Sequence, residues 1–433
     1  MEMILDERRE TKDERISGMG MYKLGDLCSD VVDCPHSTPE WKNEGIRVIR
    51  NFNIVNGSLD FSNGFFVDEE TFEKRTQRAC PEFEDLVISR EAPMGAVCMI
   101  PKNLKCCLGQ RLVLLKVNKD VADPNYILFA IQSQFVQKQI QIIDQTGSIV
   151  SNLNIPDLKS LRIPLPSLLE QKKIASVLSA LDDKIALNKK MNQKLEAMAK
   201  RLYDYWFVQF DFPDKNGHPY KTTGGPMTYN PTLKREIPAG WEVKQICDIA
   251  KIFNGSTPST TEEGNYGGEI VWITPKDLSD QNCKFVYQGA RNITQAGYDS
   301  CSTTMVPKGT VVMSSRAPIG LLSIAQCDLC TNQGFKNMVP NDMTDSKYLY
   351  YTIQQHIPQI QNLGTGTTFK EVSKDELGRF AILYPPKKLI TTFEEKMAPI
   401  FDVQFNKVKE ISRLTKLRDK LLPLLMNGQV EVK

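Results

Sequence analysis

The sequence predicts an α+β fold in which two tandem α+β domains are separated by two long helices that form an antiparallel coiled coil. Three observations lead to this prediction: an internal repeat along most of the 433 residues, strand-like runs in each half, and a heptad pattern after each domain. A chain of this length also exceeds what a single hydrophobic core usually serves, so at least two domains are expected.

The internal repeat appears as short matching segments. Residues 22–39 align without a gap to residues 241–258, and both segments end in Ser-Thr-Pro. Further along, residues 89–95 (SREAPMG) match residues 314–320 (SSRAPIG), with a slightly larger spacing that indicates small insertions. The two halves are therefore duplicates of one unit.

Each half begins with strand-like runs that are rich in β-branched residues and separated by Gly and Pro. We expect a helix over residues 124–143, because Pro124 is compatible with a first turn and apolar residues follow close to helical spacing. The expected strands are 46–49, 86–89, 112–117 and 161–166 in the first half, and 270–273, 311–314 and 380–385 in the second. Each repeat thus predicts one α+β domain.

A different pattern follows each domain. Residues 168–206 contain neither Gly nor Pro, and a mostly apolar stripe advances in alternating steps of four and three, which is typical of a coiled coil. The same frame returns 219 residues later, and the middle of each stripe is polar. The expected seam residues are Ile174, Leu178, Leu181, Ile185, Asn188, Asn192, Leu195, Leu202, Phe393, Met397, Ile400, Ile411, Leu414 and Leu421.

A long amphipathic helix packed only on its own domain is the alternative for each stripe. The repetition of the seam in one frame favours pairing of the two helices instead. A helix of roughly 40 residues would be roughly 60 Å long, so an antiparallel pair would act as a spacer. The predicted segments are a charged leader (1–21), a first domain (22–166), a long helix (167–210), a linker rich in Pro and Gly (211–240), a second domain (241–385) and a second long helix (386–433).

Composition excludes several classes of protein. The chain has 54 basic and 52 acidic residues, a net charge of +2, and 41% hydrophobic residues, so it is neither a polybasic tail nor an acidic disordered protein. No apolar run approaches the roughly 18 residues that a membrane span needs, and the amino terminus has no apolar signal-peptide core. We expect a cytoplasmic protein without a membrane partner.

Metal and catalytic motifs are also missing from the sequence. The eleven cysteines are scattered, and the single CxxC, Cys327 to Cys330, has no second CxxC or paired histidines near it, so we predict no zinc site. The three histidines form no HExxH motif, and there is no GxSxG, P-loop or GxGxxG signature. We therefore predict no catalytic residues in this chain.

Two related but non-identical domains at a fixed distance suit a bipartite target such as DNA. Arg can contact guanine or phosphate with two donors, Gln and Asn can pair with adenine, and Ser or Thr can bond to either. Turn chemistry is an equally common role for any single polar loop residue. The candidate DNA-binding residues are Ser37, Thr38, Arg90, Gln110, Ser256, Thr257, Lys276, Arg316, Gln333 and Lys336, and the Gly-containing turns 146–148 and 364–368 are weaker candidates for holding phosphate.

From about Tyr22 to Lys433 the chain resembles the specificity (S) subunits of type I restriction-modification systems. Four segments in this order carry the resemblance: LPSLLEQKKIASVL at 165–178, LDDKI at 181–185, YWFV at 205–208 and IPAGW at 237–241. The second copy departs from the pattern, with PPKKLI at 385–390 where the family often repeats Leu-Pro and Glu-Gln.

The resemblance implies a non-catalytic subunit with two target-recognition domains, each of which recognises one half of an interrupted double-stranded DNA target. It implies two methyltransferase subunits held by the helices, and motor-nuclease subunits in the restricting complex. Adenine-N6 methylation with S-adenosylmethionine, and ATP and Mg, would belong to those partners, with no cofactor bound by this chain.

Two other classes stay open from the residues alone. A bivalent protein-binding scaffold would lack the steep salt dependence of DNA binding. A self-contained DNA methyltransferase would need the catalytic and cofactor motifs that this sequence lacks, and would bind S-adenosylmethionine on its own.

Overall fold

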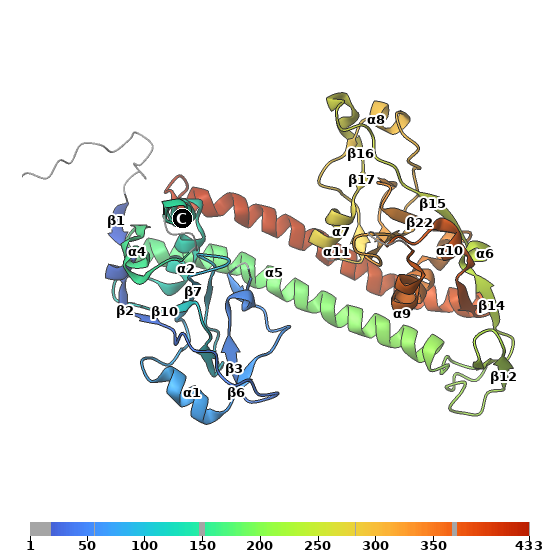
Figure 1. Ribbon diagram of the computed structural model, residues 1–433, viewed down its shortest axis with the longest axis horizontal. Coiled ribbons are helices and arrows are strands. Elements are labelled where there is room, and N and C mark those ends of the chain that lie inside the picture. Colours follow the sequence, from blue (N-terminus) through green and yellow to red (C-terminus); the bar gives the residue numbers. More distant parts are fainter. Residues whose placement is uncertain (1–18, 56, 147–151, 282, 366–369, 433) are drawn as a thin grey trace, which may run out of the picture. The chain divides into compact units, whose positions relative to one another are not determined.

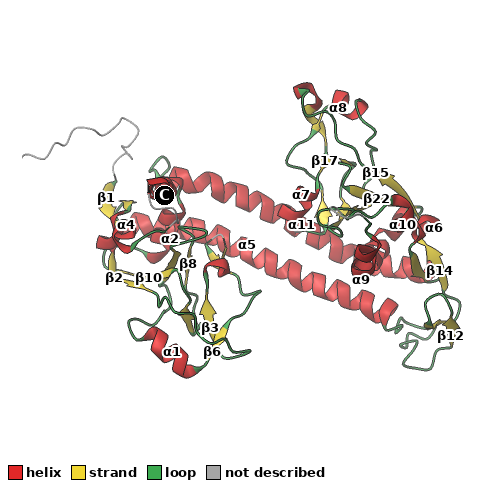
Figure 2. Cartoon of the chain, in the orientation of Figure 1, coloured by secondary structure: helices red, strands yellow, loops and turns green. Residues whose placement is uncertain are grey.

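The computed structural model describes residues 19–55, 57–146, 152–281, 283–365 and 370–432 (Figure 1). The chain forms two compact units. The first contains the described residues up to Asn188 together with those from Glu410 onward, and the second contains Lys189–Lys409. Each unit therefore holds one domain of mixed helices and strands and a segment of each long helix (Figure 2).

The first domain is built on a four-stranded antiparallel sheet in the order β2-β10-β7-β8. A smaller sheet, β6-β3-β9, lies across it, and β3 runs parallel to β9. The strands are β1 (Gly20–Lys23), β2 (Cys28–Asp33), β3 (Ile46–Ile49), β4 (Ile54–Val55), β5 (Ser58–Leu59), β6 (Phe66–Val67), β7 (Leu86–Ser89), β8 (Val97–Met99), β9 (Cys106–Leu108), β10 (Leu112–Val117) and β11 (Arg162–Leu165).

Both faces of the larger sheet are buried, as the alternation along β7 shows. Leu86 and Ile88 contribute to one cluster with the apolar side chains of α2, whereas Val87 contributes to another with residues of β3 and β9. The helices of this domain are α1 (Glu69–Thr76), α2 (Pro124–Gln132), α3 (Gln134–Thr146) and α4 (Ile155–Ser160).

The second domain repeats this plan with a five-stranded sheet in the order β15-β22-β19-β20-β18 and a parallel pair, β17-β21. The strands are β14 (Glu242–Gln245), β15 (Ala250–Asn254), β16 (Tyr266–Ile270), β17 (Trp272–Ile273), β18 (Phe285–Val286), β19 (Val311–Ser314), β20 (Leu322–Ala325), β21 (Cys330–Thr331), β22 (Phe335–Pro340) and β23 (Ala381–Tyr384). The helices are α6 (Ile246–Ile249), α7 (Pro275–Gln281), α8 (Gln295–Asp299), α9 (Ser346–Leu363) and α10 (Lys374–Arg379).

The long helices are α5 (Leu168–Tyr203) and α11 (Lys387–Met426), and they pair antiparallel within each unit. In the first unit, Lys173 bonds to Val432 and Asp182 pairs with Arg418, so partner numbers fall as α5 numbers rise. In the second unit, Asn192 bonds to Gln404 and Trp206 lies beside Phe393. The predicted fold class, two α+β domains separated by two long antiparallel helices, is thus observed.

The connector after α5 is folded. Residues 211–240, the predicted linker, contain the hairpin β12 (Met227–Asn230) and β13 (Arg235–Pro238). Phe212 stacks on Tyr220 and Trp241, with ring centroids 4.5 and 5.3 Å apart, and these rings join the aromatic cluster of the second unit. Aromatic packing explains why a segment rich in Pro and Gly is ordered here.

Several predicted elements agree with the structure and others differ in their bounds. The strands at 46–49, 86–89, 112–117 and 311–314 have the predicted bounds. The helix over 124–143 is interrupted at Ser133, whose hydroxyl accepts from the amide of Val136 and so caps a second helix. The run 270–273 divides between β16 and β17. The first domain begins at β1, two residues before Tyr22, and residues 1–18 of the charged leader lie outside the described residues.

Candidate nucleic-acid interface

In the first domain, four strand ends bring polar loops together. The carboxyl ends of β2, β3, β7 and β9 meet at one edge, where Cys34 N bonds to Leu112 O (3.1 Å) and Gly109 N bonds to Ile49 O (2.7 Å). Asn51 Nδ2 donates to Ala92 O (2.7 Å), which ties the loop after β3 to the loop after β7. Exposed loops held by a rigid scaffold are the usual setting for a binding site.

Arg90 lies at the base of this edge. Its guanidinium donates to both carboxylate oxygens of Asp33 (2.8 and 2.9 Å) and to Leu153 O (3.0 Å), and the residue is only 9% exposed. A cation that is buried and already paired with a carboxylate attracts a phosphate weakly. This geometry fits positioning of the loops better than the DNA contact that the sequence predicted for Arg90.

The remaining predicted residues of the first domain lie in one corner. Ser37 and Thr38 are exposed, and Gln110 donates through Nε2 to the carbonyl of His36, so the two loops are joined. Arg75, a buried residue of α1, donates to the carbonyls of Pro35, Ser37 and Leu108 at 2.9–3.2 Å. Arg75 therefore holds the backbone of this corner from inside the domain, while the Ser37 and Thr38 side chains are exposed.

The second domain has the same scaffold. The bond from Arg90 N to Arg111 O (2.8 Å) has its counterpart in Ser315 N to Gly334 O (2.8 Å). Likewise, the bond from Leu153 N to Arg90 O (2.9 Å) corresponds to Val372 N to Ser315 O (3.0 Å). Ser315, rather than Arg316, is therefore the structural counterpart of Arg90.

In the second domain, the Glu371 carboxylate lies close to two cations of the loop edge. Its carboxylate lies 3.1 Å from Lys336 Nζ and 3.9 Å from Arg316 Nη1, and it accepts from Ser315 Oγ at 3.3 Å. Lys336 is 5% exposed, so it also fits a positioning role rather than the predicted DNA contact. Arg316 is half-buried, so its guanidinium group is more accessible than the ammonium group of Lys336.

The other predicted residues of the second domain border the same loops. Thr257 Oγ1 donates to Gln333 Oε1, and Ser256 N bonds to Thr331 O (2.9 Å). Lys276 is exposed in the first turn of α7, and its neighbour Pro275 lies next to Gly334. The structure thus brings these residues together around one edge.

The sequence did not single out four residues that shape these loops: Asp33, Asn51, Arg75 and Glu371. Asp33 and Glu371 lie 57 and 35 residues from the cations they hold, so no local motif could reveal the pairing. The Gly-containing turns proposed for phosphate extend into 147–151 and 366–369, which lie outside the described residues.

Along the long helices, none of the expected seam residues is exposed. Ile174, Leu178, Ile185, Asn188, Phe393 and Met397 are buried. The half-buried members are Leu181, Asn192, Leu195, Leu202, Ile400, Ile411, Leu414 and Leu421. In the second unit, the Asn192 and Gln404 amides each donate to the other's backbone carbonyl at 3.3 Å, which matches their neighbouring positions across the pair.

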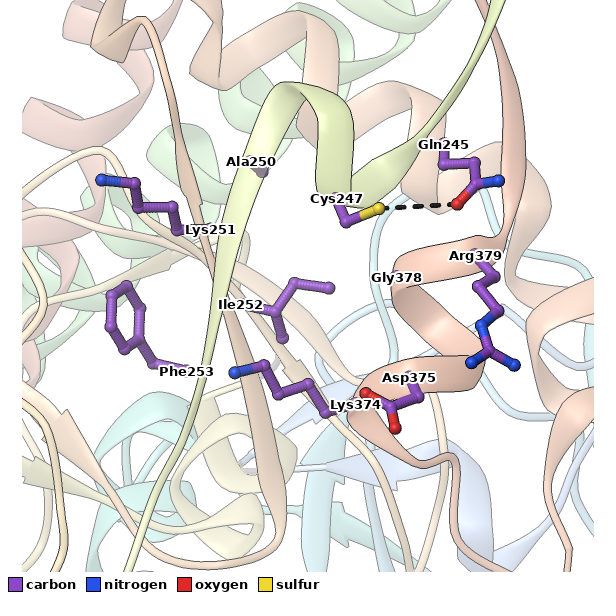
Figure 3. A pocket seen from close by; sticks show the side chains of 10 residues that line it. All are labelled: Gln245, Cys247, Ala250, Lys251, Ile252, Phe253, Lys374, Asp375, Gly378 and Arg379. Atoms are coloured by element: carbon purple, nitrogen blue, oxygen red, sulfur yellow. Dashed lines mark hydrogen bonds between the residues drawn. The ribbon is translucent and has the colours of Figure 1, made fainter.

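A cavity of about 490 Å³ lies on the second domain between β15, α6 and α10 (Figure 3). The side chains of Lys251, Lys374 and Arg379 line it together with Ile252 and Phe253. Across the described parts of both units, no group of three or more His, Cys, Asp or Glu side chains is arranged to hold a metal ion. Burial raises the pKa of the Cys330 thiol to about 12, so it is a poor thiolate ligand.

Within the residues that the structure describes, no helix is long and apolar enough to span a bilayer.

Comparisons with known proteins agree on one family. The type I restriction modification DNA specificity domain matches residues 16–197 and again residues 238–417. The MjaIX specificity subunit of Methanocaldococcus jannaschii is 39% identical over 184 residues, or 42% of this chain and 43% of that protein. That alignment spans less than half of the relative's length.

Two further similarities extend over more of the chain. The HindI specificity subunit of Haemophilus influenzae is 24% identical over 375 residues, or 75% of this chain and 81% of the relative. The crystal structure of an S subunit from M. genitalium shares the fold, with a TM-score of 0.60, 17% identity, and coverage of 96% of this chain and 98% of that one. Because the family matches both halves and most of the residues, this chain belongs to the type I restriction modification DNA specificity family and carries its domain twice.

Proposed function

We propose that this chain is the DNA-binding specificity subunit of a type I restriction-modification complex. In this proposal each domain recognises one half of an interrupted target, and the long helices bind the methyltransferase subunits. The names of the relatives, type I restriction enzyme specificity subunits, support the proposal.

One observation carries the proposal beyond family membership. The two domains share the same backbone bonds at the loop edge but differ in side-chain charge there. The first domain has the Arg90–Asp33 pair, whereas the second has Ser315 with Arg316 near Glu371. A common scaffold with different donors and acceptors at its edge is what two unlike half-sites require.

The residues that fit direct contact are those with exposed or half-buried polar groups at the edge. In the first domain these are Ser37, Thr38 and Gln110, with Arg111, whose side chain is 55% exposed and 2.9 Å from Glu91. In the second domain they are Thr257, Lys276, Arg316 and Gln333. The near-neutral total charge is compatible with this role, because phosphate contacts need only local cations.

The rest of the proposal concerns partners. Two methyltransferase subunits would methylate adenine N6 with S-adenosylmethionine, and motor-nuclease subunits would use ATP and Mg. This chain would bind none of these cofactors and would contribute no catalytic residue. Such a complex acts on chromosomal DNA, so its place would be the cytoplasm.

Co-expression with the methyltransferase subunit that we expect to be encoded beside it tests the proposal, in a host without adenine methylation. Single-molecule sequencing should then reveal a methylated motif of two short half-sites around a fixed gap. A soluble, co-purifying complex that methylates nothing and binds DNA without a log-linear salt dependence would contradict the proposal and favour a protein scaffold. S-adenosylmethionine binding by the isolated chain would favour a methyltransferase.

A further inference from the structure

The first domain carries an exposed aromatic surface, whereas no aromatic ring is exposed among the described residues of the second domain. We define the aromatic platform as five rings and two arginines from β3 and the segments on either side of it, next to the β4–β5 hairpin: Trp41, Phe52, Phe61, Phe65, Phe66, Arg47 and Arg50. Phe52 and Phe61 are 41% and 37% exposed, whereas the other rings are half-buried. Phe52 and Phe61 therefore form the exposed part of the platform, and the other three rings form its half-buried part.

Both arginines lie against rings instead of carboxylates. The Arg47 guanidinium carbon is 4.6 Å from the centre of the Phe61 ring, and that of Arg50 is 4.9 Å from the centre of Phe52. Among the described residues, no carboxylate lies within 4 Å of either guanidinium, and Arg47 Nη1 is buried without a hydrogen-bond partner. Two positive charges thus remain unneutralised beside two exposed rings.

A buried asparagine holds the backbone of the platform. Asn53 is 4% exposed and connects its parts, because Arg50 N donates to Asn53 Oδ1 (3.0 Å) and Asn53 Nδ2 donates to Asp60 O (2.8 Å). These bonds fix the segments that carry Phe52 and Phe61. A fixed ring loses little conformational entropy when it binds, so the arrangement suits a contact surface.

The platform is continuous with the proposed DNA-binding edge. Asn51 lies between Arg50 and Phe52, and its bond to Ala92 O links the platform to the loop after β7. A Cβ on Gly109 would lie 3.0 Å from Arg50 Cγ, so the Arg50 side chain crosses directly over the loop before Gln110. At the corresponding place after β17, the second domain has helix α7 with Lys276.

We propose that Phe52 and Phe61 stack on bases of the half-site bound by the first domain and open a base step there, while Arg47 and Arg50 contact the adjoining phosphates. Exposed apolar rings that enter a duplex unstack a step and bend the DNA, and every base offers a π-face to them. The unpaired arginines favour a polyanion over an apolar protein surface as the occupant. This inference rests on the proposed function.

The experiment uses the complex of this chain with its methyltransferase subunits and the target duplex found by methylation mapping. 2-Aminopurine is placed in turn at each position in and beside both half-sites, because its fluorescence rises when it is unstacked. Methyltransferases extrude the adenine that they modify, so those positions are left out of the comparison. With the wild-type complex we expect a further rise at one step of the first half-site. Phe52→Ala and Phe61→Ala should each abolish or reduce that rise and weaken binding roughly tenfold.

Matched controls separate ring contact from general damage. Phe83 of the same domain is 51% exposed and lies outside the platform, so Phe83→Ala should change neither binding nor fluorescence. Phe52→Trp and Phe61→Trp keep a ring and should preserve the rise even if an alanine variant fails to fold. Arg47→Gln and Arg50→Gln should each reduce the slope of log binding constant against log salt by about one.

Three results would overturn the inference. The first is a wild-type complex that binds its target with no fluorescence rise outside the methylated adenines, which leaves the proposed function intact. The second is a rise at such a step that persists in the Phe52→Ala/Phe61→Ala double variant. The third is a double variant that binds DNA normally but no longer co-purifies with the methyltransferase, which would identify the platform as a protein contact. A wild-type complex that binds no DNA would overturn the proposed function as well.

Discussion

The Lys284 ammonium group is bonded to the Glu196 carboxylate of α5 and lies 3.8 Å from the centre of the Phe401 ring of α11. Its side chain is 7% exposed, and Tyr351 Oη is 3.0 Å from the same nitrogen. Burial lowers the pKa of Lys284 despite the neighbouring carboxylate. Within the second unit, one buried cation therefore connects the domain to both long helices.

Loss of Glu196 should destabilise the second unit more than loss of Lys284. Glu196→Gln leaves a buried ammonium without its anion, whereas Lys284→Met replaces it with an apolar side chain. Because Glu196 is about a third exposed, we expect a cost of about 1–3 kcal/mol rather than the full value for a buried pair. The double variant should recover part of it, and equal losses in both single variants would contradict this reasoning.

Tryptophan fluorescence during urea unfolding can measure this effect. Trp206, Trp241 and Trp272 all lie in the second unit, while Trp41 lies in the first. The signal therefore reports mainly on the unit that contains Lys284.

The second unit should lose stability as pH falls through about 6.5. Burial lowers the pKa of His356 from 6.5, and its Nδ1 bonds to Thr352 O at 2.7 Å, so the folded state holds the neutral ring. The unfolded chain then binds more protons than the folded chain below pH 6.5, and stability present above that pH is lost. His356→Gln should flatten the profile between pH 7 and 5.5, whereas exposed His218→Gln should not.

The ion pair of the first unit should show positive coupling in a double-mutant cycle. Arg418 Nη1 lies 3.0 Å from Asp182 Oδ1, yet burial outweighs this cation and raises the pKa of Asp182. Arg418→Met would leave a partly buried carboxylate unpaired and should cost about 1 kcal/mol. Addition of Asp182→Leu should restore part of that loss, and strict additivity in chemical unfolding would show that the pair contributes nothing.

Sequence patterns predicted the repeated elements well and the side-chain partners poorly. The strands 86–89 and 311–314 were predictable because both of their faces are buried and apolar. The break at Ser133 depends on a local helix cap, and the fold of the connector depends on ring stacking. Neither is visible in the periodicity of apolar residues. Arg90 is a residue type that often contacts DNA. In the structure it is buried and paired with Asp33, a carboxylate 57 residues away in the sequence.

Substitution of Arg316 should affect one half-site only. Its guanidinium is half-buried at the loop edge of the second domain, and its counterpart in the first domain is an acidic residue, Glu91. If Arg316 contacts a base with two donors, Arg316→Ala should reduce discrimination at one position of the second half-site by about 1–3 kcal/mol. Methylation mapping that shows equal relaxation of both half-sites would contradict the assignment.

The length of the helix pair should set the gap between the half-sites. α5 and α11 pair antiparallel within each unit, and removal of one heptad from each helix preserves the apolar frame of the seam. Seven residues correspond to about 10 Å of helix, or about three base pairs of duplex. Matched deletions of 189–195 and 403–409 should therefore change the gap in the methylated motif by up to about three base pairs, with both half-sites unchanged. Deletion of five residues from each helix rotates the following seam positions by about 140° and should abolish methylation, because the seam side chains then turn away from each other. A gap that stays constant in an active heptad-deleted complex would show that something other than the helices fixes the spacing.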